Sequence, residues 1–173
     1  MVGLSPDVSE VYLLHFRSPF FEEHESIREL VRTEWRGSCF RTQSLKKDYR
    51  RLANIPPGET FCLKRSCVSC RTIMLSRAYR YMERIKADFV VTGEMVGRNG
   101  LGETEMEGIL ENLGIAGYVL RPLSARRLAA THPEREGWIP RMSLGNLRAD
   151  EPEKLITLAA TLGLPTDLSL IHI

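Results

Sequence analysis

Long apolar runs are missing from this chain of 173 residues. Its longest apolar stretches are far too short to span a bilayer, and its first residues do not follow the pattern of a signal peptide. Cysteine is also scarce, with four residues, which argues against a secreted disulfide scaffold. We therefore expect reduced cysteines in a cytoplasmic protein that has no membrane contact.

Glycine loops with the Gly-x-Gly-x-x-Gly or Walker spacing are missing too, although residues 94–100 are rich in glycine. No histidine lies near the closely spaced cysteines, which makes a Cys/His zinc finger improbable. There is no internal repeat. With 43% apolar and 27% charged residues, the composition predicts one globular domain over residues 1–173 that is large enough to bury a core.

The chain does contain a cysteine pair, Cys67 and Cys70, followed by apolar residues at helical spacing. We expect the pair to open this helix, where the helix dipole together with Arg65 and Arg71 would make a thiol more acidic and a better nucleophile. Sulfur transfer, redox chemistry and metal binding, with Cys62 as a third ligand, all remain open. The alternative is a pair of small buried side chains that start the helix.

A short strand over Asp88–Val91 is expected next, followed by the turn Thr92-Gly93-Glu94. Ligands of open α/β sheets bind at the carboxyl ends of the strands. The cysteine pair and this turn are therefore predicted to share one site.

The remaining pattern alternates strands and helices and so predicts a parallel α/β sheet. Its strands are expected over Val11–Phe16, Gly37–Phe40 and Tyr118–Leu120. Segment 132–138 is interpreted as polar. Helices are expected over Glu22–Arg32, Leu45–Leu52, Glu103–Leu113 with its end at Gly114, a short segment capped by Ser124, and Glu153–Leu162 with its end at Gly163.

Positive charge is concentrated between Arg41 and Arg77. This segment has nine basic and two acidic residues, a net charge of +7, whereas the whole chain has +2. A basic patch beside a reactive site suits a polyanion such as RNA, and a solvated basic loop is the alternative.

Taken in order, several stretches resemble the PP-loop ATP pyrophosphatase superfamily, in particular its tRNA thiouridine synthase (4-thiouridine synthase and 2-thiouridylase) branch. The resemblance covers about Val11 to Gly163. The stretches that carry it are Leu14-His15-Phe16-Arg17-Ser18-Pro19-Phe20-Phe21, Cys67-Val68-Ser69-Cys70-Arg71-Thr72-Ile73-Met74-Leu75, Ala87-Asp88-Phe89-Val90-Val91-Thr92-Gly93-Glu94-Met95-Val96-Gly97, Leu120-Arg121-Pro122-Leu123-Ser124-Ala125 and Glu134-Arg135-Glu136-Gly137-Trp138.

The resemblance implies a Rossmann-like parallel sheet with flanking helices, of the adenine nucleotide alpha hydrolase type, that binds ATP with Mg²⁺ and adenylates a uridine of tRNA. Sulfur from a donor protein or from sulfide then displaces AMP. By position, Cys67 and Cys70 would transfer the sulfur or ligate a [4Fe-4S] cluster. Nucleotide contacts would come from Phe16 near the adenine, from Thr92, Gly93 and Glu94, and from Arg121 at a phosphate or the tRNA.

The chain also departs from that family. The Ser-Gly-Gly-x-Asp-Ser loop that grips pyrophosphate does not occur in it, and neither does the Gly-Gly-Cys stretch with the third cysteine. We expect a partial domain that lacks its first strand, with a tail at 164–173 that does not belong to the natural protein. Such a chain is expected to be inactive alone and only marginally stable, because neighbouring strands would keep unpaired edges.

Two other functions stay open at this stage. One is a PP-loop relative that binds RNA without turning over ATP. The other is a small metal or redox module that uses Cys62, Cys67 and Cys70. The modified uridine, the sulfur donor and the oligomeric state are not determined by the sequence.

Overall fold

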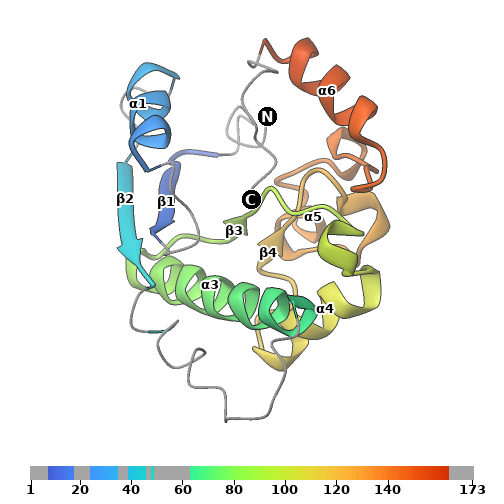
Figure 1. Ribbon diagram of the computed structural model, residues 1–173, viewed down its shortest axis with the longest axis horizontal. Coiled ribbons are helices and arrows are strands. Elements are labelled where there is room, and N and C mark those ends of the chain that lie inside the picture. Colours follow the sequence, from blue (N-terminus) through green and yellow to red (C-terminus); the bar gives the residue numbers. More distant parts are fainter. Residues whose placement is uncertain (1–7, 18–23, 35–38, 46–47, 49–62, 164–173) are drawn as a thin grey trace. The chain divides into compact units, whose positions relative to one another are not determined.

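The computed structural model describes residues 8–17, 24–34, 39–45, 48 and 63–163 (Figure 1). The chain divides into two compact units, residues 1–78 and residues 79–173. Each unit is described by itself below.

The first unit contains a β-α-β element. Strand β1 (Tyr12–Arg17) is followed by helix α1 (His24–Glu34) and strand β2 (Cys39–Ser44). The two strands are parallel, with Tyr12 opposite Cys39 and Arg17 opposite Ser44. The predictions of β1 and α1 are confirmed, whereas β2 lies further along the chain than expected. The helix predicted over Leu45–Leu52 falls almost wholly outside the described residues.

Helix α3 (Leu63–Ile85) is longer than the sequence pattern indicated. The expected start after the cysteine pair is wrong, because Cys67 and Cys70 lie inside this helix of 23 residues. The physical reason is that residues 63–85 contain neither glycine nor proline, so nothing in them interrupts a helix. Leu75, Tyr81 and Met82 form its buried side.

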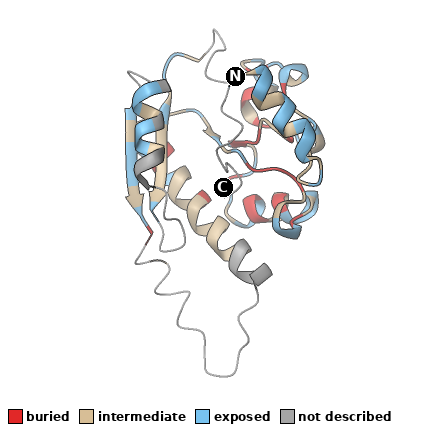
Figure 2. Ribbon diagram, turned by 45° about the horizontal axis from the view of Figure 1, so that its top comes forward, coloured by how far each residue is buried: buried red, intermediate tan, exposed pale blue. Residues whose placement is uncertain are grey.

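The second unit contains another β-α-β element, in which β3 (Val90–Val91) and β4 (Val119–Leu120) are parallel. Helix α4 (Glu103–Asn112) connects them and packs Met106, Ile109 and Leu110 into the core. Both residues of β4 are buried. Figure 2 colours the ribbon by burial, with buried residues in red. Gly114 ends this part of the chain with φ +68°, as predicted for a residue that follows a helix.

Short helical segments follow β4. They are a 3-10 helix over Ala125–Arg127, helix α5 (His132–Arg135), a 3-10 helix over Arg141–Ser143, and helix α6 (Pro152–Thr161). Helix α5 was not predicted. It begins with a capping box in which the Glu134 carboxylate accepts hydrogen bonds from the Thr131 backbone N–H and hydroxyl, at 2.8 and 2.6 Å.

The protein is thus a mixed helix and strand structure with small parallel sheets, compatible with an α/β fold. Within the described residues there are two two-stranded sheets, β1-β2 and β3-β4, and not one larger sheet. No helix among those residues has the length and apolar character needed to cross a membrane.

Candidate functional site

The carboxyl ends of β3 and β4 place four of the predicted site residues in the second unit. The Thr92 backbone N–H donates to the Leu120 carbonyl at 3.0 Å, which aligns the ends of the two strands. Gly93 follows, and a Cβ atom there would meet no other atom within 4 Å. Thr92, Gly93, Glu94 and Arg121 therefore lie at one edge of the parallel pair, and their predicted contacts with a nucleotide stay a prediction.

The Thr92 hydroxyl is the most unusual atom at this edge. Its Oγ1 is buried, yet it has no hydrogen-bond partner in the described structure. Leaving a buried hydroxyl unpaired costs about 1–3 kcal/mol, so nearly all such groups have a partner. A ligand that offers an oxygen or nitrogen at this edge would satisfy the hydroxyl.

Arg121 and Glu94 form a buried ion pair at the same edge. Arg121 Nε donates to Glu94 Oε2 at 3.2 Å, and their side chains are 2% and 10% exposed. Arg121 Nη2 also donates to the Met106 carbonyl at 3.1 Å, which fixes α4 to the end of β4. The guanidinium is thus used inside the protein, and its predicted contact with a phosphate or tRNA stays a prediction.

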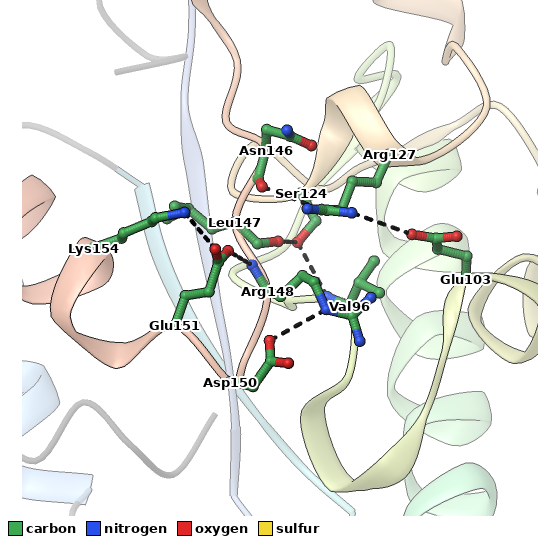
Figure 3. A network of polar contacts seen from close by, with 10 residues as sticks. All are labelled: Val96, Glu103, Ser124, Arg127, Asn146, Leu147, Arg148, Asp150, Glu151 and Lys154. Carbon is green, nitrogen blue, oxygen red and sulfur yellow. Dashed lines mark hydrogen bonds and ion pairs between the residues drawn. The ribbon is translucent and has the colours of Figure 1, made fainter.

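The loop after β3 is held by Ser124 (Figure 3). The Val96 N–H donates to Ser124 Oγ at 3.0 Å, and the Ser124 hydroxyl donates to the Leu147 carbonyl at 2.6 Å. Ser124 does precede a short helical turn, but its side chain does not cap that turn. The prediction of a capping serine is therefore wrong, because two buried backbone groups from distant segments use the hydroxyl instead.

A second part of this network lies around Glu151 (Figure 3). Its carboxylate accepts hydrogen bonds from the Arg148 backbone N–H and the Lys154 ammonium. These contacts, the Lys154 bond first, lower the pKa of Glu151 below its usual range. They order the start of α6, which follows an isolated parallel bridge between Val96 and Arg148.

The cysteine pair lies in the part of α3 that belongs to the first unit. Cys70 is half-buried, and its Sγ donates a weak hydrogen bond to Met74 Sδ at 3.7 Å. Cys67 and Cys70 are the fifth and eighth residues of α3, so the proposed activation by the helix N-terminus is wrong. The dipole effect falls off within the first turn. Among the described residues, no three His, Cys, Asp or Glu side chains gather to hold a metal ion.

Phe16 lies half-buried near the end of β1, in the first unit. Its neighbour His15 stacks on Phe40 of β2, with ring centroids 6.3 Å apart. Because Phe16 and Cys70 belong to the first unit and Thr92 to the second, a site that combines them stays a prediction. Of the basic segment, the described Arg77 is paired with Asp48 at 3.0 Å.

The sequence reasoning missed a row of ring contacts in the second unit. It starts at Tyr79 on α3 and continues through Tyr118 and His132 to Trp138, with centroid distances of 5.8, 5.8 and 5.1 Å. From the sequence, segment 132–138 is recognisable only as polar. The Thr131-x-x-Glu134 pattern of a capping box was the available signal that a helix begins there.

Comparison with known proteins returns no match: no protein-family model, no curated protein and no solved structure resembles this chain closely enough to be significant. The resemblance to PP-loop enzymes therefore rests on the quoted residues. The function proposed below rests on those residues and on the site geometry.

Proposed function

We propose that this chain is a domain of an ATP-dependent tRNA sulfurtransferase, in which a tRNA uridine is adenylated and then thiolated. On this proposal each β-α-β element is a part of a Rossmann-like fold. The support is that both elements consist of parallel strands joined through a helix, which is the repeating unit of such sheets.

The observation that carries the proposal is the unpaired Thr92 hydroxyl beside the open backbone of Gly93. Both lie where ligands of open α/β sheets bind, at the carboxyl end of a parallel strand. A hydroxyl donor with open space beside it suits a ribose hydroxyl or a phosphate oxygen of ATP. The buried Glu94–Arg121 pair would hold this edge in place rather than contact the nucleotide.

The chemistry needs a leaving group and a sulfur nucleophile. The uridine carbonyl oxygen attacks the α-phosphate of ATP and releases pyrophosphate, with Mg²⁺ neutralising the phosphates. Sulfur then attacks the activated carbon, and AMP leaves with the original oxygen. If the sulfur is a cysteine persulfide, the second cysteine thiolate breaks the S–S bond, and an external thiol reduces the resulting disulfide.

Cys67 and Cys70 suit this second step because positions three apart in a helix are neighbours on its surface. A [4Fe-4S] cluster needs at least a third ligand. Among the residues that the structure describes, no such group of ligands gathers.

The test is to purify the chain without air, treat it with polysulfide, and measure bound sulfur by the mass of the intact protein. We expect added sulfur on the parent chain, and its loss in Cys67→Ser and Cys70→Ser. Cys39→Ser is the matched control, because Cys39 is a free, exposed cysteine on β2 and should not affect loading. Equal loading of all three variants, or no loading at all, would contradict the sulfur-carrier role.

Iron content and ATP cleavage in the presence of tRNA are measured on the same samples. Iron that disappears in both pair variants would assign the pair to a cluster. Because the chain contains no Ser-Gly-Gly-x-Asp-Ser, no pyrophosphate release by this chain alone is expected. Pyrophosphate release by the purified chain would contradict that expectation.

Two observations favour a second function, binding of RNA without catalysis. The cysteines lie inside α3 and not in its first turn. Arg121 is buried in an ion pair with Glu94. The cysteines and the arginine therefore do not have the positions that were expected for an activated thiol and a phosphate contact. A chain that binds tRNA but takes up neither sulfur nor iron would support this second function. A chain that takes up iron without binding tRNA would instead indicate a metal or redox module.

A further inference from the structure

The row of four rings in the second unit comes from three separate elements. Tyr79 lies on α3, Tyr118 directly before β4, and His132 and Trp138 at and after α5. Consecutive rings meet edge to face or tilted, at interplanar angles of 64°, 48° and 78°. The His132 backbone N–H also donates to the Gly117 carbonyl at 2.7 Å. This hydrogen bond fixes the start of α5 against the residue before Tyr118.

This row is not a closed core cluster. Tyr118 is 38% exposed, and the His132 side chain is 35% exposed. Tyr79 and Trp138 are half-buried. Large aromatic side chains held in fixed positions at a surface are the feature that proteins use to stack single-stranded bases, because every base has a π face.

Positive charge accompanies the rings. The part of α3 that belongs to the second unit, residues 79–85, contains two arginines and one glutamate. Both arginines, Arg80 and Arg84, are exposed on the same last turns as Tyr79. Arg135 of α5 is also exposed. Its guanidinium lies beside Gly117, with Nη2 3.1 Å from the position that a Cβ atom would take there. Acidic neighbours exist as well, namely Glu83 near Tyr79 and Glu136 near His132.

We propose that the ring row Tyr79–Tyr118–His132–Trp138, flanked by Arg80, Arg84 and Arg135, binds single-stranded RNA by stacking its bases. Charge complementarity with the phosphate backbone is the argument for a polyanion, and the exposed rings are the argument for unpaired bases. The choice of RNA over DNA rests on the proposed function. The evidence for the surface itself consists of the ring contacts and the flanking arginines. The surface includes neither the cysteine pair nor Thr92.

The test uses Trp138 as the reporter. The chain has two tryptophans, so Trp35→Phe leaves Trp138 as the single emitter. Titration of this protein with an oligouridylate of 12 nucleotides should quench its fluorescence, and a fully paired RNA duplex should quench it far less. Tyr118→Leu should weaken oligouridylate binding about 5- to 150-fold, the factor that corresponds to 1–3 kcal/mol per stacked base.

Two controls separate stacking from folding. Tyr118→Phe keeps the ring and should bind nearly as well as the parent. Tyr12→Leu removes a tyrosine of equal exposure, 37%, from the first unit and should have no effect on binding. Arg80→Gln should lower the slope of log affinity against log salt by about 0.7, whereas Arg28→Gln, an exposed arginine of α1, should leave it unchanged.

The proposal is overturned if Tyr118→Leu and Tyr118→Phe bind alike, or if the duplex quenches as strongly as the single strand. It is equally overturned if the folded parent binds no oligouridylate at all. These outcomes are distinct from failure of the proposed function. A chain that takes up no sulfur but binds oligouridylate would contradict the sulfurtransferase proposal and support the RNA surface. A chain that takes up sulfur but binds no oligouridylate would contradict only the RNA surface.

Discussion

Arg121 donates from Nε to Glu94 Oε2 at 3.2 Å, and this buried pair joins the residues that follow β4 and β3. Removing one partner of a buried pair leaves a charge without compensation, at a cost of about 3–5 kcal/mol. We therefore expect Glu94→Gln to lower the free energy of unfolding by about that amount. Unfolding in urea is followed through Trp138 fluorescence in the Trp35→Phe background, which reports on the second unit.

Glu103→Gln is the matched control for this prediction. Glu103 pairs with Arg127 at 3.8 Å, and the side chains are 46% and 28% exposed. Exposed pairs are typically worth less than about 1 kcal/mol because water screens them. A Glu94→Gln variant no less stable than Glu103→Gln would show that the buried pair does not hold the strand ends.

Ser124→Ala tests the link between the loop after β3 and the segment at Leu147. The substitution leaves the buried Val96 N–H and the Leu147 carbonyl without their partner, at about 1–3 kcal/mol for an unsatisfied group. Ser143→Ala is the control, since Ser143 is exposed and donates only to the nearby Pro140 carbonyl. It should change stability by less than about 0.5 kcal/mol. Equal effects of the two substitutions would argue against the role of Ser124.

Gly145 is expected to tolerate no side chain. A Cβ there would lie 2.4 Å from the Leu123 carbonyl oxygen, a backbone atom that cannot swing away. Gly145→Ala should therefore cost more than about 2 kcal/mol, within the range of overpacking. In contrast, Gly108→Ala places a methyl group in open space within α4 and should stabilise by about 0.5–1 kcal/mol. In thermal melts we expect a lower Tm for Gly145→Ala and a higher Tm for Gly108→Ala than for the parent chain.

Tyr79 should make stability depend on alkaline pH. Burial, then the negative charge of Glu83 and the neighbouring Tyr118, raises the pKa of Tyr79 above the ordinary phenol value. The folded state thus favours the protonated phenol, and this contribution is present below about pH 10 and is lost as the pH rises through the higher folded value. Tyr79→Phe should remove tyrosinate absorbance that appears at a higher pH than that of an ordinary phenol.

The same variant should reduce the loss of stability above about pH 10. Tyr12→Phe is compared in parallel, because it removes one phenol from the first unit and corrects for the number of phenols. If Tyr79→Phe removes absorbance that appears early in the titration, the inferred direction of the shift is wrong.

The local elements followed from short-range patterns in the sequence. The apolar run before Arg17 predicted β1, and Gly114 and Gly163 marked helix ends where the backbone has positive φ. The order of strand, helix and strand also predicted parallel pairing, which both sheets have. These features depend on the intrinsic preferences of neighbouring residues, so they can be recognised without tertiary contacts.

The cysteine pair was predicted to open a helix, but it lies inside α3. The apolar spacing from Ile73 onward indicated a helix but did not fix its start, since nothing between Leu63 and Cys70 breaks a helix. The reactivity argument built on a helix N-terminus failed for that reason. Helix starts without a capping signal are poorly determined by spacing alone.

The sequence by itself determined the type of most strong elements and the parallel connection of the strands. Only the tertiary structure decided that Arg121 pairs with Glu94, that Ser124 bridges Val96 and Leu147, and that four rings from three elements form a row. The reason is physical. These contacts join residues 6 to 39 positions apart in the chain, and such pairings follow from how the segments pack, which local preferences do not encode.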